Sequence, residues 1–97
     1  MTTIPEIQSA VTHEYGLESL DLISARRGGG IARARQIGMY LARHLTTLSL
    51  PSIGRTFGDR HHTTVLHGVR RVAALMIENK EFAMRVGTLR KRLEGAI

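Results

Sequence analysis

Residues 50–76 constrain the fold of this chain more than any other segment, because two helical patterns meet there at a glycine. The first pattern spaces its apolar residues three and four apart, at Leu50, Ile53 and Phe57. Pro51 suits the first turn of this short helix, and Gly58 suits its end. The second pattern spaces its apolar residues four, three and four apart, at Val65, Val69, Val72 and Met76. The segment therefore predicts a helix-turn-helix, although a plain helical hairpin within a bundle has the same spacing.

The rest of the chain shows similar helical spacing, and no segment alternates apolar and polar residues as a strand does. Thr3 and Glu6 have the spacing of a capping box, so a helix should begin there and end near Gly16. Further helices are expected over residues 17–24, with Ser19 as a candidate cap, over residues 31–48, and from Asn79 onward with Phe82, Val86, Leu89 and Leu93 on one side. The prediction is an all-α fold of about six helices.

Residues 26–30 interrupt these helices with two arginines and three successive glycines. Three glycines in a row cost too much chain entropy for a helix interior, so this segment is expected to be a flexible basic loop. It is either a linker or, with Arg26 and Arg27 at its mouth, a contact to phosphate or to a DNA minor groove. Gly38, inside the expected helix 31–48, either marks a close helix crossing or is simply tolerated.

The distribution of charge points to a polyanion as partner. The formal net charge is +6. At a length of 97 residues, one domain over residues 1–97 is expected to carry this charge. Residues 1–21 carry acids and no Lys or Arg, whereas residues 22–77 carry nine Arg and a single acid, Asp59. The guanidinium group bonds phosphate and guanine in a forked manner, so this cluster favours a polyanion-binding surface over a merely basic one.

Composition and motifs argue against several classes of protein. The chain has no cysteine, which excludes disulfides and thiolate metal sites. No apolar run approaches the roughly 18 to 20 residues of a membrane span, and the acidic N-terminal region does not resemble a signal peptide, so a cytoplasmic protein is expected. No GxxxxGK[ST] loop, nucleophile elbow or carboxylate pair stands out. Neither nucleotide binding, nor a cofactor, nor enzymatic activity is therefore expected.

The polar residues that begin the second helix of the pair have the chemistry of DNA recognition. Arg60 could bond guanine O6 and N7, and His62 could donate to a base or to a phosphate oxygen. Thr63 and Thr64 could bond phosphate or contact a thymine methyl group. The positive end of the helix dipole adds attraction for phosphate. These residues therefore favour a recognition helix over a hairpin of purely structural role.

The histidines of this segment do not predict a metal site. His61 and His62 are expected to point in different directions, and His67 lies five residues after His62, which is not a spacing that shares a helix face. His67 has a competing interpretation as a partly buried, hydrogen-bonded residue.

The chain closely resembles a known family over nearly its whole length. The residues that carry the resemblance are Ser49, Leu50, Pro51, Ile53, Gly54, Phe57, Gly58, Arg60 and the run from His62 to His67, with Ala32, Arg33, Arg35, Gln36, Ile37 and the Arg26–Arg27 loop upstream. This pattern resembles the C-terminal DNA-binding domain of the bacterial replication initiator DnaA. The resemblance implies a helical domain related to the Trp-repressor fold. Its recognition helix would enter the major groove of a short asymmetric site in double-stranded DNA, while a basic loop reaches the adjacent minor groove.

The resemblance also implies roles for individual residues. Arg27 would be the arginine in the minor groove. Contacts in the major groove and to phosphate would come from Arg60, His62, Thr63 and Thr64. Contacts to the DNA backbone would come from Arg43, Ser49 and Arg71, with Leu50 and Pro51 near it.

Three departures from the family pattern bear on the DNA target. The family usually has Asp where this chain has His61. Asp accepts a bond from cytosine N4, whereas His is an ambiguous acceptor and can donate to guanine, so the base preference is expected to change there. Asp59 replaces a usual Gly and is expected to clamp Arg60 beside the DNA. Residues 28–30 are glycines where the family has polar and basic residues, which predicts a looser minor-groove loop.

The start of the chain bears on its biological role. A full initiator carries an ATPase module ahead of this domain, whereas this chain begins with Met1 just before the first helix cap. Together with the altered recognition residues, this favours a free-standing relative over an excised domain. Such a relative could not melt an origin by itself, but on the nucleoid it could regulate transcription or compete with the initiator for sites. The alternative function is a protein-interaction module that docks on replication or transcription proteins and binds little DNA.

Overall fold

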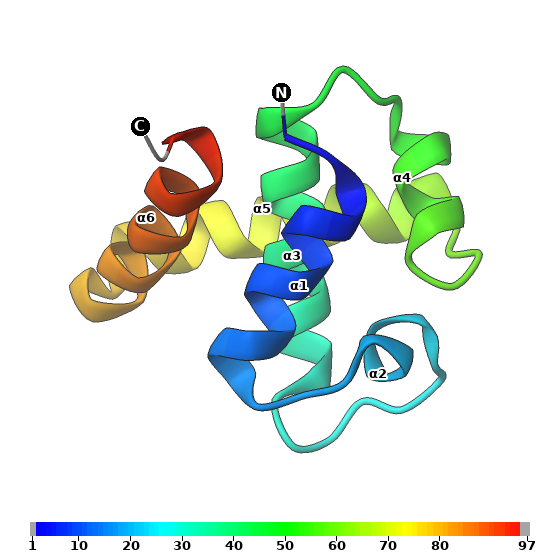
Figure 1. Ribbon diagram of the computed structural model, residues 1–97, viewed down its shortest axis with the longest axis horizontal. Coiled ribbons are helices and arrows are strands. Elements are labelled where there is room, and N and C mark those ends of the chain that lie inside the picture. The colour runs from blue at the N-terminus through cyan, green and yellow to red at the C-terminus, as the bar shows by residue number, and fades with distance from the viewer. Residues whose placement is uncertain (1, 96–97) are drawn as a thin grey trace.

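The chain is helical throughout the part that the computed structural model describes, which is residues 2–95 (Figure 1). Six helices and no strand lie in this part, namely α1 (Ile4–Tyr15), α2 (Ser19–Ile23), α3 (Ile31–Leu45), α4 (Leu50–Thr56), α5 (His62–Glu78) and α6 (Lys80–Gly95). The predicted all-α fold is confirmed. In Figure 1, α3 occupies the middle of the molecule, with α2 and α4 to its right and α6 to its left.

The first helix begins and ends where its sequence predicts. The Thr3 hydroxyl accepts a hydrogen bond from the Glu6 backbone N–H at 3.4 Å, and the Glu6 carboxylate accepts one from the Thr3 backbone N–H at 2.9 Å. This reciprocal capping box satisfies donors that the first turn leaves free. At the other end, Gly16 adopts a left-handed conformation and its N–H bonds back to the His13 and Thr12 carbonyls.

Two predicted helix boundaries are wrong by a few residues. Ser19 is the first residue of α2, and its cap is Glu18, whose backbone N–H bonds the Asp21 carboxylate at 2.9 Å. The helix expected over residues 31–48 ends at Leu45. Thr46 stops it, because this residue is extended and both its N–H and its hydroxyl donate to the Ala42 carbonyl, at 3.1 and 2.7 Å. The apolar residues keep their helical spacing beyond Leu45, but the hydrogen bonds of Thr46 end the helix there.

The hydrophobic core surrounds α3, which packs against α1 and α5 and, more lightly, against α2, α4 and α6. Fifteen buried residues form one cluster, namely Ile7, Val11, Leu22, Ala34, Ile37, Met39, Tyr40, Leu41, Ala42, Ile53, Phe57, Val65, Val72, Val86 and Leu89. Gly38 is part of this packing, since a Cβ there would lie 2.7 Å from Cε1 of Phe57. The interpretation of Gly38 as a point of close approach is therefore confirmed. Its missing side chain brings the end of α4 down onto α3.

A tight turn places α5 against α4. The Arg60 N–H donates to the Gly54 carbonyl at 2.9 Å, and the Phe57 N–H donates to the same oxygen at 3.2 Å. A Cβ on Gly54 would collide with the Arg60 carbonyl oxygen, so only glycine lets the turn fold back so closely over α4. Gly54 thus sets the distance between the two helices of the pair.

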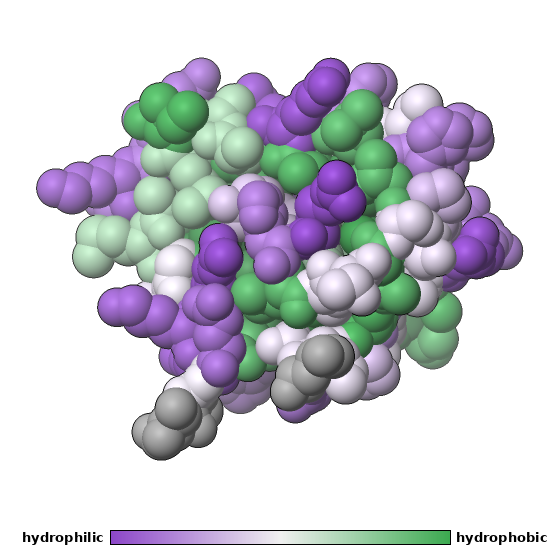
Figure 2. All heavy atoms as spheres, turned by 90° about the horizontal axis from the view of Figure 1, so that it is seen from above, coloured by the Kyte–Doolittle hydropathy of each residue, from purple (hydrophilic) through white to green (hydrophobic). Residues whose placement is uncertain are grey.

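The α5–α6 end of the molecule exposes apolar side chains. Ile77 is 88% exposed and Met84 is 64% exposed. In the view of Figure 2, green and pale-green surface lies at the upper left, on the side where α6 lies in Figure 1, and more of it is spread over the centre. Within the described residues, no helix combines the length and the apolar character needed to cross a membrane.

Candidate nucleic-acid interface

The first turn of α5 exposes a run of polar side chains. His61, His62, Thr63 and Thr64 are all exposed, and so are His67, Arg70 and Arg71 further along the helix. The positions between them point inward, since Val65, Gly68 and Val72 are buried. The apolar spacing of the sequence predicted this division. Four of the residues predicted to contact DNA, His62, Thr63, Thr64 and Arg71, therefore lie on the outer side of the second helix of the pair.

His61 caps α5 with its side chain. Its backbone is extended, with φ −64° and ψ 149°, and its Nδ1 accepts a hydrogen bond from the Thr63 backbone N–H at 3.2 Å. The same Nδ1 lies 2.8 Å from the Thr63 hydroxyl oxygen. The ring therefore does the work that an Asp, Ser or Thr side chain usually performs at a helix start.

The rings of His61 and His62 lie against each other. Their centroids are 4.1 Å apart with 34° between the ring planes, so the expectation that they point in different directions is wrong. The cap explains the difference, because it folds the His61 ring back over the helix start. The interpretation of His67 as partly buried is also wrong, since this residue is exposed.

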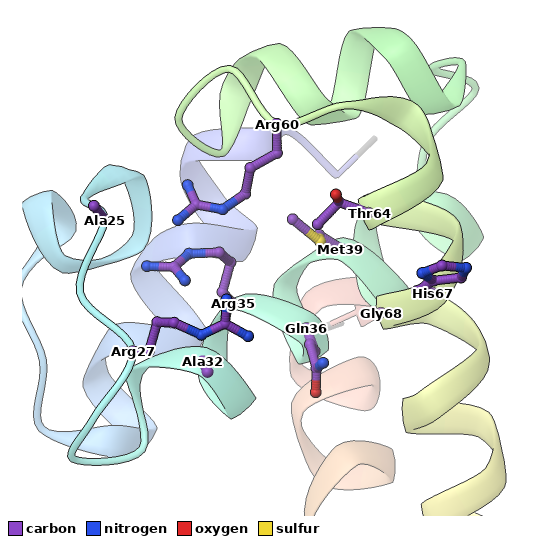
Figure 3. A pocket seen from close by; sticks show the side chains of 10 residues that line it. All are labelled: Ala25, Arg27, Ala32, Arg35, Gln36, Met39, Arg60, Thr64, His67 and Gly68. Atoms are coloured by element: carbon purple, nitrogen blue, oxygen red, sulfur yellow. The ribbon is translucent and has the colours of Figure 1, made fainter.

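A pocket of about 440 Å³ lies between the loop that follows α2, the outer side of α3 and the start of α5 (Figure 3). It is lined by Ala25, Arg27, Ala32, Arg35, Gln36, Met39, Arg60, Thr64, His67 and Gly68. Three of the predicted site residues, Arg27, Arg60 and Thr64, thus meet around one hollow. Figure 3 shows Arg60 reaching from the turn toward Arg35, with Arg27 beyond it on the loop.

Arg35 forms the floor of the loop side of this pocket. The residue is 5% exposed. Its Nε donates to the carbonyl of Leu22 at 2.8 Å, and its Nη2 donates to those of Asp21, Ser24 and Arg26 at 2.9, 3.0 and 2.9 Å. One guanidinium therefore satisfies four backbone acceptors of a segment that has few regular hydrogen bonds of its own. Arg35 belongs to the interior rather than to the basic surface that the arginine count suggested.

Arg60 holds the same loop from the other side. Its Nη2 donates to the Ser24 carbonyl at 2.6 Å, the oxygen that Arg35 also binds, and its Nη1 donates to the Phe57 carbonyl. The expected clamp between Asp59 and Arg60 is wrong: no ion pair joins them in residues 2–95. Asp59 instead occupies a left-handed position of the turn, with φ 55°, which accounts for a glycine being usual there.

The three guanidinium groups make the pocket strongly positive. Burial, and then the charges of Arg60 and Arg27, lower the pKa of Arg35. Burial, and then the charge of Arg27, lower the pKa of Arg60. Both groups remain charged at neutral pH, because arginine starts from a very high pKa. An anion entering the pocket would relieve this repulsion, so the geometry suits a phosphate group.

The remaining predicted residues lie outside the pocket. Arg43 is exposed in the last turn of α3, and Arg71 is exposed on α5. Ser49 caps α4, because its hydroxyl accepts from the Ser52 backbone N–H at 3.2 Å. Of its neighbours, Pro51 is exposed whereas Leu50 packs partly against the core. None of these five residues lines the arginine pocket.

Three polar residues of the pocket were missed as site candidates: Arg35, Gln36 and His67. A signal for two of them was present in the sequence, since Ala32, Gln36 and Met39 share one side of α3, and Thr64, His67 and Gly68 share one side of α5. Two such faces that combine small and polar residues can pack closely and still leave polar groups at the rim. The contacts of Arg35 had no such signal.

Comparison with known proteins gives the family. The model of the bacterial DnaA protein helix-turn-helix matches residues 4–72, which include α4, α5 as far as Val72, and the arginine pocket. The chain belongs to this family. It is 50% identical over 93 residues to the chromosomal replication initiator protein DnaA of Caulobacter vibrioides and 52% identical over 93 residues to that of Gluconobacter oxydans. The DnaA protein of Cereibacter sphaeroides is 47% identical over 92 residues.

These relatives are much longer than the region of similarity. The aligned residues are 95 to 96% of this chain but only 19 to 20% of each DnaA protein. The similarity therefore concerns the C-terminal helix-turn-helix domain of DnaA and leaves most of the initiator without a counterpart in the sequence compared.

Proposed function

We propose that this chain binds double-stranded DNA sequence-specifically, at sites similar to those of DnaA. The first turn of α5 would enter the major groove, and the loop that carries Arg27 would reach the adjacent minor groove. The observation that carries the proposal is the positive pocket between these two elements, which places Arg27 and Arg60 beside the exposed polar start of a helix. Residues 1–97 would act as one DNA-binding unit without catalytic activity.

The shape and chemistry of α5 support insertion into the major groove. An α-helix with side chains is about 10 to 12 Å across, and the major groove is about 12 Å wide. The exposed groups at its start are imidazole rings, hydroxyls and methyl groups, which match base edges and the thymine methyl. His62, Thr63 and Thr64 would make these contacts.

The other exposed cations support contacts to the DNA backbone. Arg43 and Arg71 are exposed, and Ser49 and Pro51 lie at the exposed start of α4 with Leu50. Arginine and serine side chains of this kind bond phosphate oxygens. We assign these residues to phosphate and sugar contacts that orient the protein on the duplex and carry no sequence information of their own.

The biological role follows from the relatives and is part of the proposal. The similar proteins are named chromosomal replication initiators. A domain that occupies their sites on the nucleoid would act in the control of replication initiation or in transcription regulation, with double-stranded DNA as its principal partner.

A fluorescence-anisotropy titration of a duplex that carries a DnaA site tests the proposal. Each phosphate contact releases counterions, so the association constant should fall by at least about a hundredfold between roughly 50 and 200 mM salt. A duplex of scrambled sequence serves as the matched control and should bind more weakly at both salt concentrations. Equal affinity for the two duplexes would contradict sequence-specific recognition, and absence of binding to either would favour a protein-interaction module.

A further inference from the structure

The His61 ring offers DNA only one free polar atom, and the cap of α5 determines which atom this is. A backbone N–H can only donate, so Nδ1, which accepts from the Thr63 N–H, must carry a lone pair. A neutral imidazole with an unprotonated Nδ1 carries its proton on Nε2. The Thr63 hydroxyl, 2.8 Å from Nδ1, can donate to the same lone pair and supports this tautomer.

The surroundings of the ring preserve this arrangement. Turning the ring over would replace Nδ1 by a carbon and break the cap. Contact with the tilted ring of His62, with centroids 4.1 Å apart, further restricts the ring. His61 is nevertheless exposed, at the start of the helix assigned to the major groove. The atom that remains free for a base is therefore Nε2–H, which is a donor.

The four bases differ in the hydrogen-bond acceptors that their major-groove edges offer to a single donor. Guanine presents two adjacent acceptors, O6 and N7. Adenine and thymine each present one acceptor, beside an amino group or a methyl group. Cytosine presents only its N4 amino group, which is itself a donor and would face Nε2–H without an acceptor. A donor at this point therefore favours guanine and rejects cytosine.

We propose that His61 is a specificity-determining residue, whose Nε2–H selects guanine and excludes cytosine at one position of the target while Nδ1 caps α5. The proposal rests on the proposed DNA-binding function and adds to it the base preference of a named atom. Because the cap fixes the tautomer, helix stability and base choice depend on the same ring.

Two substitutions keep the cap but change the groups that face the DNA. They therefore separate the stability of the helix from the choice of base. Asp and Asn are both strong N-cap residues, so either should still accept from the Thr63 N–H. In His61→Asn the amide oxygen would cap and the amino group would remain a donor. In His61→Asp only acceptors would be exposed. Thermal unfolding of the three proteins checks that all remain folded.

In the experiment, the wild-type chain, His61→Asn and His61→Asp each select bound duplexes from a random pool. Each protein is then titrated with two versions of the selected duplex, which carry guanine or cytosine at the discriminating position. The wild type and His61→Asn should prefer guanine by about tenfold, and His61→Asp should reverse the preference toward cytosine. The same base selected by all three proteins, or cytosine selected by the wild type, would overturn the proposal for His61 alone. A wild-type chain that enriches no sequence would overturn the proposed function, and this proposal with it.

A measurement without DNA tests the tautomer by itself. Long-range ¹H–¹⁵N correlation spectra should show the His61 Nδ1 of the free protein as the unprotonated ring nitrogen, at a pH where the ring is neutral. An Nδ1–H tautomer would overturn the proposal whatever the selection gives.

Discussion

The two sides of the arginine pocket are held in place in different ways. On the loop side, residues 24–30, the Ser24 and Arg26 carbonyls are bound by Arg35 and Arg60, which come from α3 and from the α4–α5 turn. The helix side, the start of α5, is held by its own neighbours through the His61 cap and the close turn at Gly54. The loop depends on two side chains that are distant in sequence, so it should lose its conformation when either is removed. The start of α5 is capped locally, so it should respond mainly to changes in its turn.

Replacement of Arg35 should have the largest effect on stability. Arg35→Met keeps the length of the side chain but leaves the Leu22 and Arg26 carbonyls without a donor and removes one of two donors at Asp21 and Ser24, so the free energy of unfolding should fall by about 3 kcal/mol. Urea denaturation followed by circular dichroism measures this value. Arg33→Met, two residues away and partly exposed, is the matched control and should lower stability by less than about 1 kcal/mol. Similar losses in both variants would mean that the loop does not depend on Arg35.

Substitution in the turn should have the next largest effect. Gly54→Ala introduces a Cβ that collides with the Arg60 carbonyl, and the shift needed to remove this clash should cost about 2 kcal/mol of unfolding free energy. The same urea titration measures it. Gly87→Ala in α6, where a Cβ would meet nothing within 4 Å, should instead stabilise the chain by about 0.5 kcal/mol. A tolerated Gly54→Ala would show that the helix side does not depend on the tightness of its turn.

Arg60 links the two sides of the pocket, so its replacement tests both. Arg60→Ala removes the bonds to the Ser24 and Phe57 carbonyls and should lower the free energy of unfolding by about 1 kcal/mol. In anisotropy titrations its affinity for a DnaA-site duplex should fall much more than its affinity for a scrambled duplex, because the pocket geometry is lost as well as a charge. Arg55→Ala, an exposed arginine of α4, is the control and should weaken both duplexes little and equally. Equal losses on the two duplexes for Arg60→Ala would indicate that Arg60 contacts only phosphate.

Arg27 should affect stability least. Its side chain is exposed at the rim of the pocket, so Arg27→Ala should change the free energy of unfolding by less than about 0.5 kcal/mol. Its affinity for the site duplex should nevertheless fall about tenfold, with a shallower dependence on salt. Unfolding and binding measured on the same preparation test this separation. A large loss of stability would mean that Arg27 also helps to hold the loop, which would contradict the assignment of that role to Arg35 and Arg60.

Sequence patterns predicted what depends on spacing along one helix. The capping box at Thr3, the buried spacing of α5 and the close approach at Gly38 all appear in the structure. The same reasoning missed Arg35, because carbonyls thirteen and fourteen residues away leave no mark in local sequence. It also missed the cap at His61, since histidine is an unusual cap residue and gave no reason to expect its ring to fold back.

The interleaving of exposed and buried positions along α5 has an evolutionary consequence. His67 and Arg70 can change without disturbing Val65, Gly68 and Val72, which hold the helix on the core. Substitutions at the outer positions should therefore be close to neutral for folding. A duplicated copy of such a domain can drift to a new DNA site through one outer residue at a time, while each intermediate remains folded.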